Sequence, residues 1–237
     1  MPLSQRSFMD EDSFSSKDED VKWISERHVA CVFLLDVSSS MAGRAIKQLN
    51  KGLQTFKEQT LNNPSFDAHT KSCIDVALIT FSDKAEVIQD FVPIEDMETP
   101  VLQADGMTAM GAALNLAMDI ITERKQRYND LGTPYYRPWI FCITDGEPND
   151  NYADAIFRLK QMEQNKGVLG YCVGVEHFDR SVMASIFEQS RIFELKNLDF
   201  PALFEFVSNS LGAIRESDPN CGREIDVPAP STLKLAF

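Results

Sequence analysis

The stretch that decides the fold is Val29-Ala-Cys-Val-Phe-Leu-Leu-Asp36, which continues directly into Val37-Ser-Ser-Ser40. Seven apolar residues follow one another without a polar interruption, and oxygen-bearing side chains then occur at alternate positions. A short apolar run of this kind is typical of a strand that is buried on both faces, as in a parallel sheet covered by helices. The stretch therefore predicts a buried strand over residues 29–36 that ends in a polar loop.

Beyond this strand, the chain alternates between short apolar runs and amphipathic stretches with helical spacing, which favours a doubly wound α/β domain. Further strands are predicted at 74–82, 85–90, 139–144, 168–175 and 192–195, and helices at 42–60, 109–129, 151–164, 180–189 and 201–214. Only three polar residues, Ser82-Asp-Lys84, connect the second and third strands, so these two should form a hairpin. We expect a mostly parallel six-stranded sheet with one antiparallel strand and helices on both faces.

The predicted elements fit one domain over residues 26–214, which is a usual domain size. Residues 1–25 are rich in Ser, Asp and Glu and show no helical or strand period, so we expect an acidic, flexible N-terminal extension. Residues 215–237 contain prolines and an apolar end, and form a predicted C-terminal tail.

The composition limits the classes of partner. With 43% hydrophobic and 25% charged residues, the chain has the composition of a soluble globular protein. Its net charge of -13 opposes binding to nucleic acid and to anionic membrane surfaces. The longest apolar run is far shorter than the ~20 residues of a membrane-spanning helix, and residues 1–12 lack the pattern of a secretory signal. We therefore expect a cytoplasmic protein without nucleic-acid or membrane partners; its oligomeric state is not indicated.

Cysteine and histidine offer little for catalysis. The five cysteines are an odd number without a Cys-x-x-Cys pair, and four of them lie in apolar, strand-like segments, which favours buried reduced thiols over disulfides or a zinc site. The three histidines are scattered without metalloprotease spacing. The sequence also lacks the glycine-rich or serine motifs of nucleotide hydrolases, dinucleotide-binding enzymes and serine hydrolases.

Three separated segments carry the candidate chemistry. Asp36, Ser38 and Ser40 follow the first strand, Thr108 precedes the predicted helix 109–129, and Asp145 follows the strand 139–144. In a doubly wound sheet the carboxyl ends of the parallel strands share one edge, and ligands bind where the strand order reverses. If these segments meet there, five oxygen-bearing side chains surround one crevice. Such ligands suit hard divalent cations such as Mg²⁺, Mn²⁺ or Ca²⁺.

Three other interpretations remain open at this point. Asp, Ser and Thr are favoured at helix starts and turns, so each of the five side chains could be a cap. A magnesium-dependent phosphohydrolase could use Asp36 at a strand end, although the sequence places Ser38 where a second aspartate would favour that chemistry. A metal-independent interaction scaffold is the third possibility.

Together, Asp-x-Ser-x-Ser, a separate Thr and a later Thr-Asp-Gly resemble the metal-ion-dependent adhesion site (MIDAS) of von Willebrand factor A (VWA) domains, over residues 28–214. The resemblance implies that Ser38, Ser40 and Thr108 ligate the metal directly, whereas Asp36 and Asp145 act mainly through water. It also implies a non-enzymatic module that binds an acidic residue of a partner protein. Residues 105–114 further resemble bacterial cytoplasmic TerY-type proteins, which implies a role in stress response or tellurium resistance.

Overall fold

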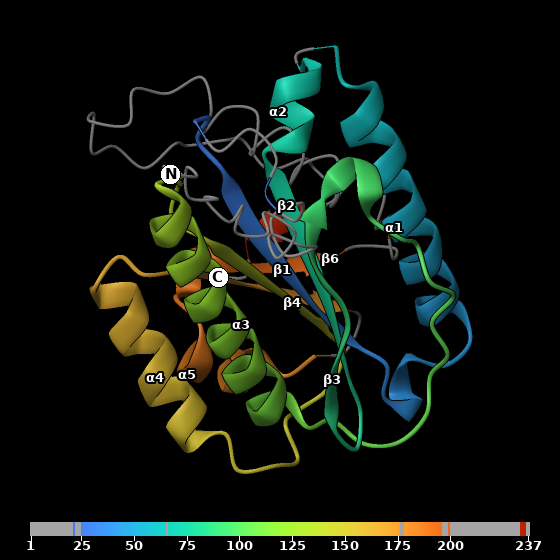
Figure 1. The fold of residues 1–237 in the computed structure, drawn as a ribbon. Coiled ribbons are helices and arrows are strands. Elements are labelled where there is room, and N and C mark those ends of the chain that lie inside the picture. The colour runs from blue at the N-terminus through green and yellow to red at the C-terminus, as the bar shows by residue number, and fades with distance from the viewer. Residues whose placement is uncertain are drawn as a thin grey trace, which may run out of the picture.

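The computed structural model describes residues 21, 25–64, 66–175, 178–195, 199 and 233–235. Within this part of the chain the strands form one sheet in the order β3-β2-β1-β4-β5-β6-β7 (Figure 1). All pairings are parallel except β2 with β3 and β6 with β7. The strands are β1 (Val29–Asp36), β2 (Ile74–Phe81), β3 (Ala85–Pro93), β4 (Trp139–Thr144), β5 (Leu169–Val175), β6 (Ile192–Leu195) and β7 (Leu233–Leu235).

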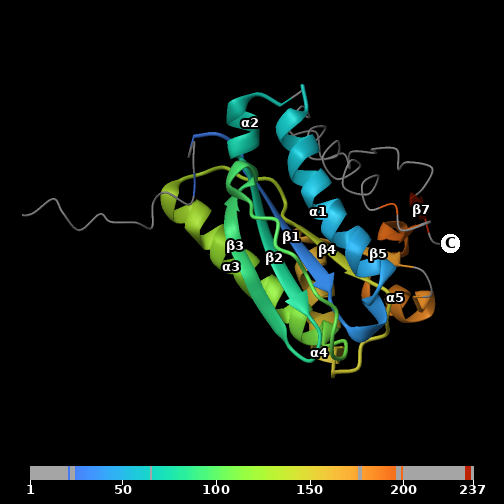
Figure 2. The same cartoon turned by 90° about the vertical axis from the view of Figure 1, so that its right-hand side faces the viewer.

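Helices lie on both sides of the sheet (Figure 2). The α-helices are α1 (Arg44–Asn62), α2 (Ala68–Ser72), α3 (Met110–Leu131), α4 (Ala153–Gln164) and α5 (Arg180–Ile186). Short 3-10 helices occur at η1 (Ser39–Met41), η2 (Ile94–Asp96) and η3 (Gln189–Arg191). α1 packs on one face of the sheet, whereas α3, α4 and α5 pack on the other.

Strand alternation divides the interior into two cores, because successive side chains of a strand point to opposite faces. In β1, the odd-numbered apolar residues pack with α1, and the even-numbered ones pack with α3. Phe33 contacts Phe56 of α1 edge-on, with ring centroids 5.2 Å apart. Every residue of β1 is buried, which explains why its sequence is continuously apolar rather than alternating.

The strand order reverses at β1. The chain proceeds from β1 outward to β2 and β3, and then returns to β4 on the other side of β1. The carboxyl ends of β1 and β4 lie at the lower end of the molecule in Figure 1, where α1, α3 and α4 begin. In doubly wound folds such a reversal leaves a crevice at the strand ends, and the candidate residues follow these same strands.

The fold prediction is confirmed, with local differences. All six predicted strands are present, and β7 adds a second antiparallel pairing from within the predicted tail 215–237. The five-residue helix α2 was not predicted. The predicted end of helix 180–189 is wrong, because the backbone at Phe187 is extended (φ -106°, ψ 158°) and its side chain is buried at 2% exposure.

Parts of the predicted extension, tail and last helix lie outside the described residues. Val21, within the predicted extension 1–25, is described and is buried in the core on the side of the sheet that α3 covers. The predicted helix 201–214 and Cys221 fall outside. The other four cysteines are described, and all are buried free thiols (Cys31, Cys73, Cys142 and Cys172). None of the described helices has the length and apolar character needed to cross a bilayer.

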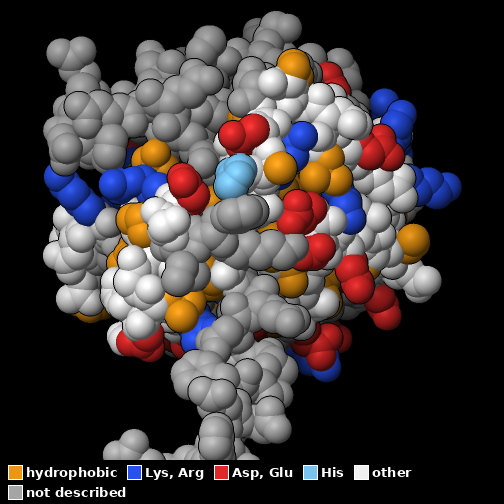
Figure 3. Space-filling view, turned by 45° about the horizontal axis from the view of Figure 1, so that its top comes forward, with side chains coloured by type: hydrophobic (Ala, Val, Ile, Leu, Met, Phe, Trp, Pro, Cys, Tyr) orange, Lys and Arg blue, Asp and Glu red, His pale blue; other side chains and the backbone are white. Residues whose placement is uncertain are grey.

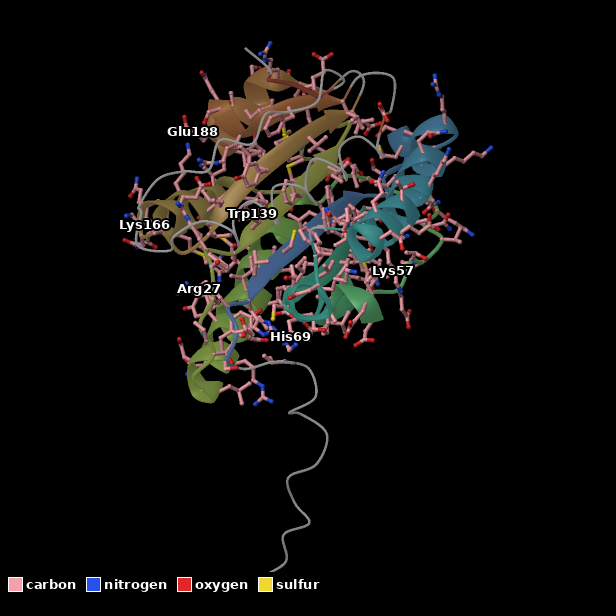
Figure 4. The ribbon with its side chains drawn as sticks, turned by 90° about the horizontal axis from the view of Figure 1, so that it is seen from above. Arg27, Lys57, His69, Trp139, Lys166 and Glu188 are labelled. Carbon is pink, nitrogen blue, oxygen red and sulfur yellow. The ribbon has the colours of Figure 1, made fainter. Side chains whose placement is uncertain are left out.

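Figure 4 views the molecule from the opposite end, where the parallel strands begin, and Figure 3 is tilted halfway towards that view. Trp139, the first residue of β4, lies between Lys166 beyond α4 and Lys57 of α1 in Figure 4. Among the described side chains visible on this face, Lys and Arg are interspersed with Asp and Glu rather than gathered into one basic area (Figure 3).

A buried ionic network fastens α3 to this end of the sheet. Asp75 of β2 accepts hydrogen bonds from Tyr128 and from His28, the latter at 2.7 Å, and its other oxygen lies 3.2 Å from the Arg124 guanidinium. Burial by itself lowers the pKa of His28, but hydrogen bonds to Asp75 and Cys73 and the charge of Asp75 raise it to about 10. His28 is therefore an imidazolium at neutral pH, paired with a buried carboxylate.

Candidate functional site

Asp36 lies at the bottom of the site, where it is buried. The side chain is fully buried at the end of β1, and both its oxygens accept hydrogen bonds: Oδ1 from the Ser38 amide at 2.8 Å and Oδ2 from the Thr144 hydroxyl at 2.5 Å. Burial raises the pKa of Asp36 above its ordinary value, and these hydrogen bonds partly offset that increase. The nearby charge of Asp145 raises the pKa further. The carboxylate is thus held in a fixed orientation between β1 and β4.

Ser38, Ser40 and Asp145 form a continuous chain of side-chain oxygens above Asp36. The Ser38 and Ser40 hydroxyl oxygens are 3.0 Å apart, and the Ser40 hydroxyl donates to Oδ1 of Asp145 at 2.7 Å. Ser38 is buried, whereas Ser40 is exposed. This row of linked oxygens therefore leads from the buried Ser38 to solvent.

Thr108 joins this group from the loop before α3. A β-carbon placed on Gly146 would lie 3.5 Å from the Thr108 hydroxyl oxygen and 3.9 Å from the Ser40 hydroxyl oxygen. Both hydroxyls therefore flank the same glycine, next to Asp145. The structure thus brings together all five predicted site residues, from three segments far apart in the sequence.

Backbone hydrogen bonds hold the loop of Thr108 against the loop after β1. The Asp105 amide donates to the Val37 carbonyl at 2.8 Å, and the Ser39 amide donates to the Gly106 carbonyl at 2.9 Å. Gly106 has a φ of +82°, which is costly for residues with a side chain. Gly106 therefore permits the turn that leads to Thr108.

The turn between β2 and β3 supports the same loop from another side. Oδ1 of Asp83 accepts the Met107 amide at 2.9 Å, and the Ser82 carbonyl accepts the Ala109 amide at 2.7 Å. A β-carbon at Gly106 would approach Asp83 to 2.9 Å, so the two segments are in close contact. Sequence reasoning identified Asp83 only as a turn residue, because its partner lies 24 residues away.

The capping interpretation fails for the helices next to these residues. Neither η1, which follows Ser38, nor α1, which follows Gly43, has a side-chain cap at its start. The residue before α3 is Ala109, not Thr108, and it supplies no side-chain cap either. The side-chain hydroxyls of Ser38 and Thr108 therefore do not cap these helices.

The residues present fit a hard divalent cation. In an octahedron with metal–oxygen distances of about 2.1 Å, neighbouring ligand oxygens lie about 3 Å apart, and the Ser38 and Ser40 oxygens have this separation. In the described part of the chain, no three Asp, Glu, His or Cys side chains gather closely enough to hold a metal.

Thr144 supports the site, although the sequence analysis assigned it no role. It is fully buried, donates to Asp36 and accepts the Gly146 amide at 3.1 Å. One hydroxyl thereby fixes both the carboxylate at the base of the crevice and the turn after β4. Its position directly before Asp145 was the available signal, since it ends a strand beside β1.

The fold and the site residues define a doubly wound α/β domain with a cluster of hydroxyls and carboxylates where the strand order reverses. A family model supports a narrower identification: residues 31–207 match the von Willebrand factor type A domain. The chain belongs to this family, whose domains commonly mediate protein–protein interaction. No curated protein matches the chain.

Solved structures show the same fold at low sequence identity. The domain is similar to proximal thread matrix protein 1 from the mussel byssus, with 18% identity and a TM-score of 0.57, over 79% of this chain and 47% of that one. A form of that protein with a zinc-occupied MIDAS motif gives 16% identity and a TM-score of 0.56, over 81% and 47%. This chain therefore spans about half the length of these relatives.

A bacterial domain is matched over nearly its whole length. The von Willebrand factor domain of the type V pilus tip protein Mfa5 from Porphyromonas gingivalis has 12% identity and a TM-score of 0.58, over 81% of this chain and 98% of that one. At such identities these likenesses bear on the fold alone.

Proposed function

We propose that the crevice binds one divalent cation, Mg²⁺ or alternatively Mn²⁺ or Ca²⁺, and uses it to hold an acidic residue of a partner protein. Ser38, Ser40 and Thr108 would be the direct ligands, and Asp36 and Asp145 would act through water. The observation that carries the proposal is the chain of oxygens from Ser38 through Ser40 to Asp145, beside Thr108.

The chemistry of the ligands explains why the partner group should be a carboxylate. Neutral hydroxyls leave most of the charge of the cation uncompensated at the open side of the crevice, so an anionic oxygen is attracted there. The loop that carries Thr108 also exposes apolar side chains that a protein surface could cover. Met107, directly before Thr108, is 61% exposed, and Val101 in the same loop is 77% exposed.

The geometry supports a binding module over a phosphohydrolase. A nucleophilic aspartate must reach the phosphorus atom with a free oxygen. Asp36 is fully buried, and hydrogen bonds from Ser38 and Thr144 occupy both its oxygens. We therefore propose a non-enzymatic role, tested by the absence of magnesium-dependent hydrolysis of p-nitrophenyl phosphate.

Calorimetric titration of the full chain with Mg²⁺ and Mn²⁺ tests cation binding. The wild type should bind one cation, and the Ser38→Ala/Ser40→Ala double variant should lose binding. Ser39→Ala is the matched control, because Ser39 lies between the two and is exposed, and its backbone amide makes the hydrogen bond to Gly106. Absence of wild-type binding at millimolar metal would favour the metal-independent scaffold.

A second titration tests the carboxylate. Water-proton relaxation of the Mn²⁺-loaded protein reports water on the metal, and acetate should lower it by replacing that water, whereas acetamide should not. Equal effects of acetate and acetamide, or none, would contradict a carboxylate-accepting position.

The biological setting is a proposal that rests on sequence resemblance alone. The stretch Asp105-Gly-Met-Thr-Ala-Met-Gly-Ala-Ala-Leu114 resembles TerY-type proteins, which supports a cytoplasmic role in stress response or tellurium resistance. Unchanged tellurite sensitivity after deletion of the gene would count against this setting.

A further inference from the structure

We infer that Asp150 is a positioning residue that fixes Thr108 relative to Asp145 by capping α3 from the loop between β4 and α4. The inference rests on the proposed function, because it assigns Asp150 to the same cation site without making it a ligand. Asp150 is five residues beyond Asp145 in the sequence, so one short loop connects the two carboxylates.

Both carboxylate oxygens of Asp150 bind the first turn of α3. Oδ1 accepts the Gly111 amide at 3.0 Å, and Oδ2 accepts the Ala112 amide at 2.8 Å. Amides in the first turn of a helix have no partner within the helix, and a negative charge there also interacts favourably with the helix dipole. Ala109, the residue before α3, supplies no side-chain cap. Asp150 performs this role instead, although it lies 39 residues from Gly111 and 38 from Ala112.

Two further contacts press the loop and the helix together. The Asn149 amide donates to the carbonyl of Thr108 itself at 3.1 Å. A β-carbon on Gly111 would come within 2.8 Å of the Tyr152 α-carbon, so only glycine permits this approach. The loop therefore touches Thr108 directly and touches the turn that follows it.

These contacts set the spacing between two segments of the site. Asp145 is held by the Ser40 hydroxyl at one end of the loop, and Asp150 grips α3 at the other end. If Asp150 releases α3, only the bond from the Asn149 amide still ties Thr108 to the loop of Asp145, so the distance between Thr108 and Asp145 is less firmly fixed. A misplaced ligand weakens cation binding even though every ligand is still present.

The test compares Asp150→Ala with Asp67→Ala. Asp67 caps α2 through the Thr70 amide at 2.7 Å, so its replacement also removes an N-cap but leaves the site segments untouched. Calorimetry well below the melting temperature should show Mn²⁺ affinity lowered about tenfold in Asp150→Ala and unchanged in Asp67→Ala. Asp150→Asn, which keeps one acceptor oxygen, should be intermediate. Equal affinities of Asp150→Ala and wild type would overturn the inference.

Two additional readouts separate positioning from general destabilisation. In the metal-free protein, hydrogen exchange of the Gly111 and Ala112 amides should accelerate in Asp150→Ala but not in Asp67→Ala; unchanged protection would refute the capping.

In a Thr108→Ala background, Asp150→Ala should weaken Mn²⁺ binding less than threefold further, because its effect passes through Thr108. A full tenfold loss there would contradict the inference. If the wild type does not bind Mn²⁺, the proposed function is contradicted, whatever the exchange data show.

Discussion

Replacing Thr144 with valine tests how strongly the base of the crevice depends on one hydroxyl. Valine has nearly the same shape, so the change removes the donor to Asp36 and the acceptor of the Gly146 amide without opening a cavity. The Asp36 carboxylate then keeps its hydrogen bonds with the amide and side chain of Ser38 but loses the one from Thr144. We expect a less stable metal-free protein and a poorly oriented carboxylate at the site.

The magnitude follows from the bond that is lost. A hydrogen bond to a charged group contributes about 1.5–3 kcal/mol to the free energy of unfolding. Because the valine leaves buried polar groups without this partner, we expect the variant to lose an amount within that range. A loss of about 2 kcal/mol corresponds to a melting temperature about 4–8 °C lower for a domain of this size. Thr144→Ser is the control, because it keeps the hydroxyl and loses only a methyl group.

Urea unfolding at pH 7 without metal measures the change in stability, and calorimetric titration with Mn²⁺ measures the change in cation affinity. Thr144→Val should be less stable than Thr144→Ser and should bind Mn²⁺ at least tenfold more weakly, whereas Thr144→Ser should bind it nearly as the wild type does. A valine variant that matches the serine variant in both stability and Mn²⁺ affinity would refute the role given to this hydroxyl.

Three other predictions concern the backbone, the buried ion pair and the thiols. Gly106→Ala should destabilise the protein more than Gly132→Ala, because both have positive φ but only at Gly106 would the new β-carbon meet a neighbour, Asp83; equal losses in urea unfolding would contradict this. The raised pKa of His28 predicts stability that is complete below pH 6.5 and falls as the pH rises towards 10, and His28→Gln should abolish that slope in unfolding titrations. In a Cys221→Ser variant, thiol reagents should react only after unfolding, since the remaining cysteines are buried: Cys31, Cys73, Cys142 and Cys172.

The central strands, and the place where the five candidate residues meet, could be predicted because their signals are local. A continuous apolar run such as 29–35 is possible only where both faces of a strand are covered, and every residue of β1 is buried. The polar residues that follow are then placed at one edge by the parallel topology. Residues 36–40 and 145 therefore met as expected, and Thr108 joined them.

The supporting residues could not be predicted, because their partners are distant in the sequence. The roles of Asp83 and Asp150 depend on amides 24 and 38–39 residues away, which no local pattern specifies. The end of α5 was misplaced for a similar reason: Phe187 leaves the helix and its side chain is buried in the core. Tertiary burial overrides helix propensity there.

The ligand assignment is the central claim, and a crystal structure of the full chain grown with Mn²⁺ tests it most directly. One anomalous-scattering peak should lie about 2.1 Å from the hydroxyl oxygens of Ser38, Ser40 and Thr108. Water should lie between the metal and the carboxylates of Asp36 and Asp145. A peak bound directly by both carboxylates and remote from Thr108 would contradict the account.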